Sequence, residues 1–448
     1  MTQINRPMKN RWLAQTCWFT AVLNAVFAHA QAQNAGNTTP SSANVSAVPA
    51  SATAPTTPSN PLLPGNPGDY DDGRLSFNPL QYGPFDIHLR AHGGVLYDDN
   101  INTSDKNKVS DVIWSLSPTV TVGVGDYRER QGNLLQVEYT PSFVLYTDNS
   151  DLSTINHAAS GEGQWKEGPW QANLSQGYQH LFDTSLDAGG FLGRDIFTTA
   201  LRGEYEISPK TSLEVNGRQL FNCVIQDNNA TTAGNSFKEW VGEVFGNYIA
   251  SPKLKLGLGF TAGWTDNQRS VDGTYQQIVA RAIYTWTEKL SVEASAGGQI
   301  QQFSEFEGEK RGNRFNGIFS AGATYRPVEK TVVGLGVYRR DGSSISLDNQ
   351  AYTATGFDVI VRQTITDRFV VGVSGGYAFS DYYSTIKTGT ADRQDNYWRM
   401  QLNLDFQLME QLTAGVFYQY RQDDSSGSTA DSFSFKNNQV GLNVAYRF

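Results

Sequence analysis

Apolar and polar residues alternate along most of the chain, and the alternation is clearest at the C-terminal end. In residues 439–448 apolar side chains occupy every second position, with Gln439, Asn443 and Arg447 between them. Because successive side chains of a β-strand point to opposite faces, this segment is predicted to be a strand with one apolar and one polar face.

The same alternation recurs from Phe85 onward in about eighteen segments, each of about 10 to 13 residues, the length that crosses a bilayer at a tilt. Residues 254–264, 278–286 and 398–406 are examples. Two kinds of joint separate the segments and alternate strictly. Short joints lie at 167–169, 208–210, 251–253, 287–289, 327–330, 366–368 and 409–411, with a slightly longer one at about 127–132. The longer polar joints are 98–110, 147–156, 183–195, 226–236, 266–274, 304–313, 341–350, 380–394 and 422–432.

Tight turns at one end and long loops at the other predict an all-β fold, an up-and-down antiparallel transmembrane β-barrel of about 18 strands. The short joints recur about every 40 residues, which is also the period of a propeller blade, but a blade needs about four strands per period and this chain offers two. The last strand is predicted to pair with residues 412–421 and, to leave no open edge, with the first strand at 87–97.

Aromatic residues gather at both ends of the predicted strands. Trp165, Trp170 and Trp286 lie beside short turns, whereas Trp264 and Trp398 lie beside long loops. Two aromatic girdles suit the two interfaces of a membrane. The alternative, a soluble β-sandwich, explains neither the strand length nor the alternation of loops.

The N-terminal part differs from the rest and predicts three regions. Arg6, Lys9 and Arg11 precede an apolar stretch and the small residues of an A-x-A site, the order expected of a secretory signal peptide at residues 1–30. Residues 31–84 are rich in Ala, Ser, Thr and Pro and are predicted to be a disordered linker, with a plug, a tether or a partner-binding tail as alternatives. The barrel is predicted to span 85–448.

Composition adds two limits. The mean hydropathy of −0.43 is compatible with a barrel, whose strands signal only by alternation. Loss of the three basic residues with the signal peptide takes the formal net charge from −9 to −12, which argues against nucleic acid as a partner.

The polar alternates of the apolar positions are predicted to line the barrel interior, or lumen. They are of mixed charge, so they could form a structural charge ladder or a path that selects solutes, and the two can coexist. The candidates are Arg90, Glu138, Arg202, Glu204, Glu214, Arg218, Arg281, Glu293, Asp358, Arg362, Arg399 and Asp405.

The sequence offers little for catalysis. It contains no H-E-x-x-H or P-loop motif, and its one G-x-S-x-G match, at residues 372–376, lies within an alternating segment and not at a strand-to-helix turn. His157 and His180, near opposite ends of neighbouring segments, are the only candidate catalytic residues for an enzyme at the barrel rim. We therefore predict no catalytic residues, no metal and no cofactor, and the chain is not expected to be an enzyme.

The segment Gly94–Ile101, together with the long hairpins and the terminal Phe448, resembles the beta-barrel porin-2 family of outer-membrane proteins. The resemblance covers about 85–448. It implies a barrel, often linked to exopolysaccharide gene clusters, and it implies no catalytic residues. Tyr446 and Phe448 also resemble the C-terminal signal that the barrel-assembly machinery reads in such proteins.

These patterns lead to one expected function and two alternatives. The expectation is a porin-like channel in the outer membrane of a Gram-negative bacterium, with long loops outside and short turns and both barrel ends in the periplasm. Its expected partners are membrane lipid and lipopolysaccharide, the barrel-assembly machinery, a polar solute or an exported polysaccharide, and periplasmic export proteins. The alternatives are a closed or plugged barrel that acts as a receptor or adhesin through its loops, and a rim enzyme.

Overall fold

The computed structural model describes residues 80–126, 131–185, 187–225, 234–309, 311–389, 391–427 and 433–448. The predicted signal peptide and most of the predicted linker lie outside these residues. The end of that linker, which the sequence predicts to be unstructured, forms a short strand, β1 (Leu80–Tyr82), paired with β2. No helix in the described ranges is long and apolar enough to cross a membrane.

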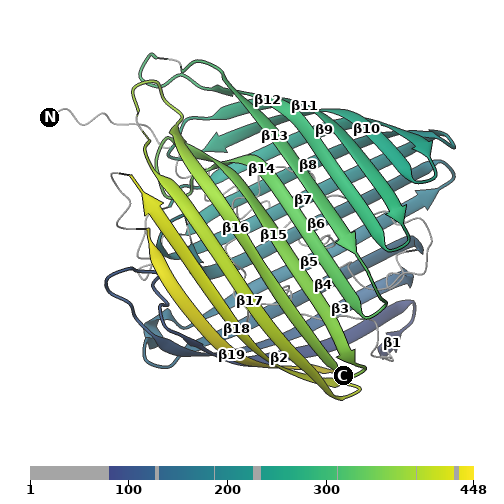
Figure 1. The fold of residues 1–448 in the computed structure, drawn as a ribbon, viewed down its shortest axis with the longest axis vertical. Helices are drawn as coiled ribbons and strands as arrows, with labels where there is room; N and C mark the ends of the chain where they lie inside the picture. Colours follow the sequence, from purple (N-terminus) through teal and green to yellow (C-terminus); the bar gives the residue numbers. More distant parts are fainter. Residues whose placement is uncertain are drawn as a thin grey trace.

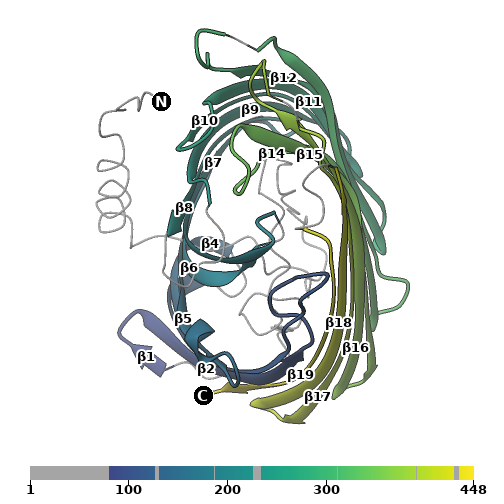
Figure 2. The same ribbon diagram turned by 90° about the vertical axis from the view of Figure 1, so that its left-hand side faces the viewer.

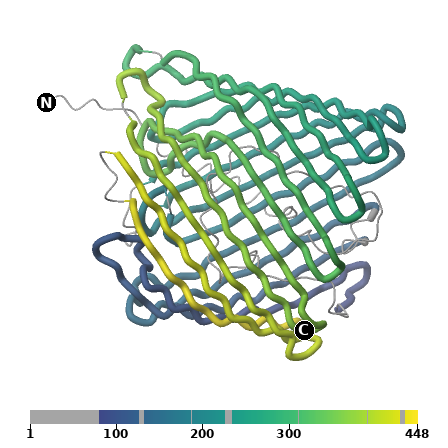
Figure 3. Tube along the Cα trace, viewed as in Figure 1, coloured from purple at the N-terminus to yellow at the C-terminus, as the bar shows by residue number. Residues whose placement is uncertain are grey.

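Eighteen long antiparallel strands form a closed barrel (Figures 1 and 3), as the sequence predicts. A short 3-10 helix, η1 (Ser150–Leu152), follows the third of them. The strands are β2 (Phe85–Asp98), β3 (Asp111–Asp126), β4 (Gln131–Tyr146), β5 (Thr154–Glu167), β6 (Trp170–Ser185), β7 (Gly190–Ser208), β8 (Thr211–Ile225), β9 (Phe237–Ser251), β10 (Leu254–Asn267), β11 (Gly273–Thr287), β12 (Leu290–Phe303), β13 (Arg314–Tyr325), β14 (Thr331–Ser343), β15 (Gln350–Thr366), β16 (Phe369–Ser384), β17 (Gln394–Met409), β18 (Leu412–Ser426) and β19 (Phe435–Arg447).

The strands are longer than the sequence pattern predicts. They run from 12 residues in β13 to 19 residues in β7. The β6–β7 hairpin shows the reason, because its ladder continues to the pair Ser185–Gly190 although the sequence places a polar loop at 183–195. Polar residues mark where the apolar face ends, whereas backbone pairing continues beyond it. We call this end of the barrel the loop end, and the end with the short joints the turn end.

The barrel closes where the sequence predicts. β19 pairs with β18 on one side and with β2 on the other, with Gln439 opposite Asp98 and Tyr446 opposite Ala91. This closure satisfies the backbone groups of both terminal strands, which an open edge would leave unpaired.

A buried polar lock holds this seam at the loop end, and it involves the segment that carries the family resemblance. The Asp98 carboxylate accepts hydrogen bonds from the side chains of Asn437 and Gln439, the latter at 2.6 Å. Asp99 accepts from the backbone N–H of Asn438 at 2.6 Å, and the Asn100 amide donates to the Lys436 carbonyl at 2.9 Å. The Asp-Asp-Asn sequence therefore joins the first long strand to the last.

One seam is incomplete. β13 and β14 pair over only seven residues, from Tyr325–Val333 to Phe319–Arg339. Beyond that point β13 stays paired with β12, and β14 stays paired with β15. Figure 2 shows the ends of β14 and β15 inside the arc of β9 to β12. The loop-end part of the β14–β15 hairpin has thus turned into the barrel, behind the wall formed by β10 to β13.

Candidate functional site

The two faces of the barrel wall differ in chemistry. On the outer face, apolar side chains are exposed in neighbouring strands, with 63% of Leu258, 64% of Ile278 and 74% of Phe315 accessible. On the inner face, polar and charged side chains such as Glu214, Glu243 and Gln277 are buried. This is the reverse of a soluble protein, and it matches a barrel with lipid outside and water inside.

Four of the predicted lumen residues form one charged network on the inner wall. Glu214 accepts hydrogen bonds from Arg202 at 3.2 Å and from Arg281 at 2.5 Å. Arg202 also contacts Glu204 at 3.3 Å, and Glu204 in turn contacts Lys255 at 3.4 Å. Alternating acids and bases from β7, β8, β10 and β11 therefore neutralise one another across strands, as a charge ladder would.

Glycines of β10 make room for the large side chains of this wall. A Cβ atom at Gly257 would meet the Arg281 side chain, and one at Gly259 would meet the Phe245 ring at 2.4 Å. The Arg281 guanidinium lies 4.3 Å from the centre of that ring, a cation–π distance. The glycines of β10 thus leave space on its inner face, which the side chains of Arg281 and Phe245 fill.

Two further pairs of predicted residues come together elsewhere. Arg90 contacts Glu138 at 2.6 Å, and Arg399 contacts Asp358 at 2.6 Å. Among the other candidates, Glu293 is half-buried and interacts electrostatically with Arg281 and Arg202 of the network. Arg218 contacts Glu239 at 3.6 Å, Arg362 is half-buried and Asp405 is buried.

The structure adds a contact across the lumen that the sequence does not predict. Asp187, in the β6–β7 turn, accepts hydrogen bonds from the Ser344 hydroxyl at 2.9 Å, the Ile345 N–H at 2.6 Å and the Tyr382 hydroxyl at 2.7 Å. The Asp187 carbonyl accepts from Arg393 at 3.1 Å. We call these five residues the lumen bridge.

The lumen bridge joins opposite sides of the barrel. Around the sheet, six strands separate β7 from β14 in one direction and ten in the other. Ile345 is buried beside Leu192 and Leu220, which anchors the bridge in apolar contacts on the far side. The bridge residues lie in joints that the sequence predicts to be long polar loops. The sequence of these joints contains no pattern that predicts their turning into the lumen.

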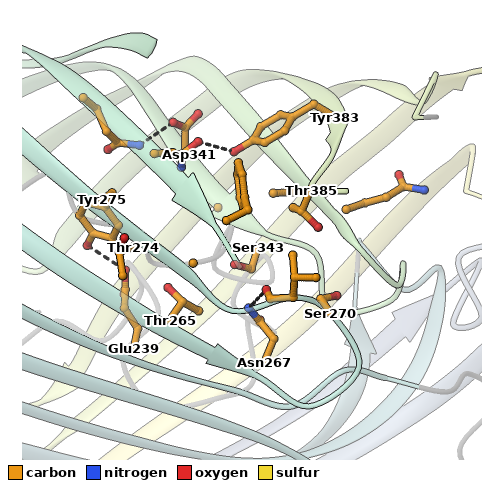
Figure 4. Close-up of a pocket in the computed structure, with 18 of the residues that line it drawn as sticks. Glu239, Thr265, Asn267, Ser270, Thr274, Tyr275, Asp341, Ser343, Tyr383 and Thr385 are labelled. Carbon is orange, nitrogen blue, oxygen red and sulfur yellow. Dashed lines mark hydrogen bonds between the residues drawn. The ribbon is translucent and has the colours of Figure 1, made fainter. Parts of the chain in front are cut away.

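A pocket opens between the wall and the inward-turned hairpin, with about 720 Å³ of space that merges with the lumen. Figure 4 shows side chains of both walls around it, with Glu239, Asn267 and Tyr275 on one side. Asp341, Tyr383 and Thr385 line the other side. The alternation of the sequence could have identified Glu239 as a residue of the inner face. It could not have identified Asp341, because the strand that carries Asp341 turns away from the barrel wall.

The two histidines proposed as handles for an enzyme are not at opposite ends of the wall. In an antiparallel hairpin the start of one strand meets the end of the next, and His157 is directly opposite His180, with ring centres 6.0 Å apart. Nδ1 of His157 contacts the Tyr139 hydroxyl and Nδ1 of His180 contacts Asp195, both at 2.9 Å. These side chains share the outer face with the exposed Trp165 and Trp170, away from the lumen.

Comparisons with known proteins support the fold only distantly. No family model matches the sequence, and no curated protein is significantly similar to it, so the resemblance to beta-barrel porin-2 stays a prediction.

Three solved structures illustrate the likeness of the fold. Pseudomonas aeruginosa OccK2 (OpdF) is 11% identical over 81% of this chain and 98% of its own, with a TM-score of 0.44. Acinetobacter baumannii OccAB3 is 11% identical over 82% and 100%, with a TM-score of 0.43. P. aeruginosa OpdK, solved with vanillate, is 10% identical over 81% and 98%, with a TM-score of 0.39. These TM-scores lie below 0.5, so the similarities assign no role to any residue of this chain.

Proposed function

We propose that this chain is an outer-membrane channel that passes polar solutes through a hydrated lumen of mixed charge. The observation that carries the proposal is the opposite chemistry of the two faces of a closed barrel: the exposed outer face is apolar, and the buried inner face carries ion pairs such as Glu214 with Arg281. A closed sheet leaves no free edge strand, which suits a wall in lipid. A barrel of this strand number has room for water and small solutes.

The predicted lumen residues have defined roles in this proposal. Arg202, Glu214 and Arg281 hold water along the wall and orient the dipoles of a passing solute. Because Glu204 and Glu214 offset most of the charge of Arg202, Arg281 and Lys255, we expect weak selectivity between small cations and anions. The long loops would face the cell exterior, and the short turns and both barrel ends would face the periplasm. Export of a polysaccharide with periplasmic partners rests on the family resemblance alone.

Conductance of the purified protein tests the proposal. Reconstituted in a planar lipid bilayer, the chain should give discrete current steps, and in liposomes it should admit small polar solutes. A preparation that is folded by circular dichroism yet shows neither current nor solute entry would contradict the channel function.

The lumen bridge favours a second candidate, a plugged barrel that serves as a surface receptor or adhesin through its loops. If the bridge blocks the path, Asp187→Ala should raise the conductance several-fold, because it removes the acceptor of three hydrogen bonds at once. Asp348→Ala is the matched control, because Asp348 forms an exposed pair with Arg269 near the same loops. Equal currents in the wild type and both variants would show that the bridge does not limit passage.

A further inference from the structure

The pocket behind the inward-turned hairpin has two walls that the incomplete β13–β14 seam brings face to face. One wall belongs to the barrel and includes Thr265 and Asn267 of β10 and Gln299 of β12. The other belongs to the hairpin and the adjoining end of β16, and includes Gln350 and Thr385. The space between them, about 720 Å³ with its opening included, is open to the lumen and is not an enclosed cavity.

The carboxylate on the hairpin wall is fully engaged by protein groups. Asp341 accepts hydrogen bonds from Gln299 at 2.7 Å, Asn316 at 2.9 Å and Thr353 at 2.5 Å, and Arg314 lies at 3.3 Å. These four partners satisfy the acceptor capacity of a carboxylate. Asp341 therefore fixes the hairpin against the wall and leaves little capacity to attract a cation.

The carboxylate on the barrel wall is also paired, although with fewer partners. Glu239 accepts from the Tyr275 hydroxyl at 2.9 Å and lies 3.6 Å from Arg218. With both carboxylates paired, the pocket presents mostly neutral amide and hydroxyl groups to its interior.

Besides Glu239 Oε2, three polar atoms of the lining have no hydrogen-bond partner among the described residues: Asn267 Oδ1, Gln350 Oε1 and Thr385 Oγ1. They come from both walls, and Thr385 is only 5% exposed. A buried polar atom without a hydrogen bond costs free energy, so these atoms mark a place where a partner is missing. Two of them are carbonyl oxygens, which accept hydrogen bonds and cannot donate them.

Asn349 links the two walls of the pocket through hydrogen bonds. Its Oδ1 accepts from the Val271 N–H at 3.1 Å, its N–H donates to the Ser270 hydroxyl at 2.8 Å, and its carbonyl accepts from the Thr385 N–H at 2.8 Å. The spacing of the three unpartnered atoms is therefore held by hydrogen bonds that do not involve a ligand.

We propose that this pocket binds a small neutral solute rich in hydroxyl groups, such as a sugar alcohol. Hydroxyl groups donate to the two carbonyl oxygens and exchange a hydrogen bond with Thr385, which can donate or accept. A carboxylate on the solute would be repelled by Asn267 Oδ1 and Gln350 Oε1, and Arg340, a cation of the lining, stacks on the Tyr338 ring at 4.8 Å. An ammonium group would gain no free carboxylate, because Asp341 and Glu239 are engaged.

This inference rests on the proposed channel function, since a solute reaches the pocket only through the lumen, and it names the class of solute that the lumen holds. Binding and passage are measured separately. Binding is measured by equilibrium dialysis of the whole purified chain in detergent, with radiolabelled sorbitol and sucrose as neutral probes, and gluconate and glucosamine as charged counterparts. Passage is measured in the planar bilayer described above.

We expect sorbitol or sucrose to bind and the two charged probes to bind at least several-fold more weakly. Thr385→Val keeps the shape of the side chain and removes the hydroxyl, and it should weaken binding of the neutral probe about three-fold to ten-fold. Gln350→Glu replaces the unpartnered carbonyl with a carboxylate and should shift the preference toward glucosamine. Thr413→Val is the matched control, because Thr413 is a half-buried threonine of β18 at the turn end.

The outcomes separate the two proposals. Absence of binding by both neutral probes, or binding that Thr385→Val and Gln350→Glu leave unchanged, overturns the pocket assignment even if the protein conducts. Binding that responds to these variants in a protein without conductance supports the pocket and contradicts the channel. A variant that loses the barrel spectrum in circular dichroism is replaced by Thr385→Ala, which is smaller and lacks the same hydroxyl.

Discussion

At the scale of single residues, Glu214 holds together two arginines from different strands. Its side chain is almost fully buried, with 2% of the residue exposed, and it contacts Arg202 of β7 and Arg281 of β11. Removal of one partner from such a group leaves the others buried and uncompensated, which is a larger loss than the net contribution of the pairs themselves.

Glu214→Gln should therefore lower stability and change ion selectivity together. We expect a loss of about 3 kcal/mol in the free energy of unfolding, measured by urea denaturation in detergent. Loss of one negative charge from this network should shift the reversal potential toward anions in a salt gradient. Glu309→Gln, in an exposed pair with Lys387, is the control and should change neither quantity. Unaltered selectivity in Glu214→Gln would place this network away from the ion path.

Gly259 gives a second residue-scale prediction, because its missing side chain is needed for packing. A Cβ atom there would lie 2.4 Å from the Phe245 ring, so Gly259→Ala must displace an aromatic side chain that covers Arg281. We expect a loss of about 1 to 3 kcal/mol, the usual effect of overpacking. Gly246→Ala on the neighbouring strand meets open space and should be neutral. If both substitutions give the same unfolding midpoint, the Phe245 side chain adapts without strain.

At the scale of elements, the seam between β2 and β19 depends on Asp98. Asp98→Ala would leave the buried amides of Asn437 and Gln439 without their acceptor, together with the backbone N–H of Asn100. We expect a loss of about 3 kcal/mol. The temperature at which the barrel loses its compact, fast-migrating form in gel electrophoresis should fall accordingly. Asp105→Ala, in the exposed part of the same loop, is the control. A midpoint equal to that of the control would mean that backbone pairing alone holds the seam.

The elements also show what alternation can and cannot predict. The alternation of apolar and polar residues predicts the strands, their order and the closing pair. It can do so because each strand carries its own pattern of one apolar and one polar face. The same parity places Arg202, Glu204 and Glu214 on one face, and in the structure these side chains contact one another. Asp341, which the sequence places in a polar joint, belongs to β14 and shares its parity with the exposed Leu335, yet the turned hairpin buries it inside. Such a turn depends on contacts between joints that are distant in the sequence, such as Asp187 with Ile345. The periodicity of the sequence does not predict contacts of this kind.

At the scale of the whole molecule, the C-terminal Phe448 can be examined for two separate roles, in assembly into the membrane and in the stability of the folded barrel. The Phe448 N–H donates to the Leu89 carbonyl at 3.1 Å, a bond that any residue at this position can make. Its ring contacts Tyr446 edge to face, with centres 4.7 Å apart, and 58% of the residue is exposed. The ring therefore adds little to packing, and a role in recognition by the assembly machinery would be separable from stability.

Phe448→Ser should accordingly impair insertion while leaving the folded barrel almost unchanged. We expect the amount of protein in the outer-membrane fraction of cells to fall several-fold. Refolded from urea into detergent, the same variant should unfold within about 1 kcal/mol of the wild type, because a largely exposed side chain contributes little to stability. Phe315→Ser is the matched control, since Phe315 is an even more exposed phenylalanine of the outer face and lies far from the chain end. Should Phe448→Ser reach wild-type levels in the membrane, or lose stability and level in parallel, the terminal aromatic would act through the fold and not as a signal that is read during assembly.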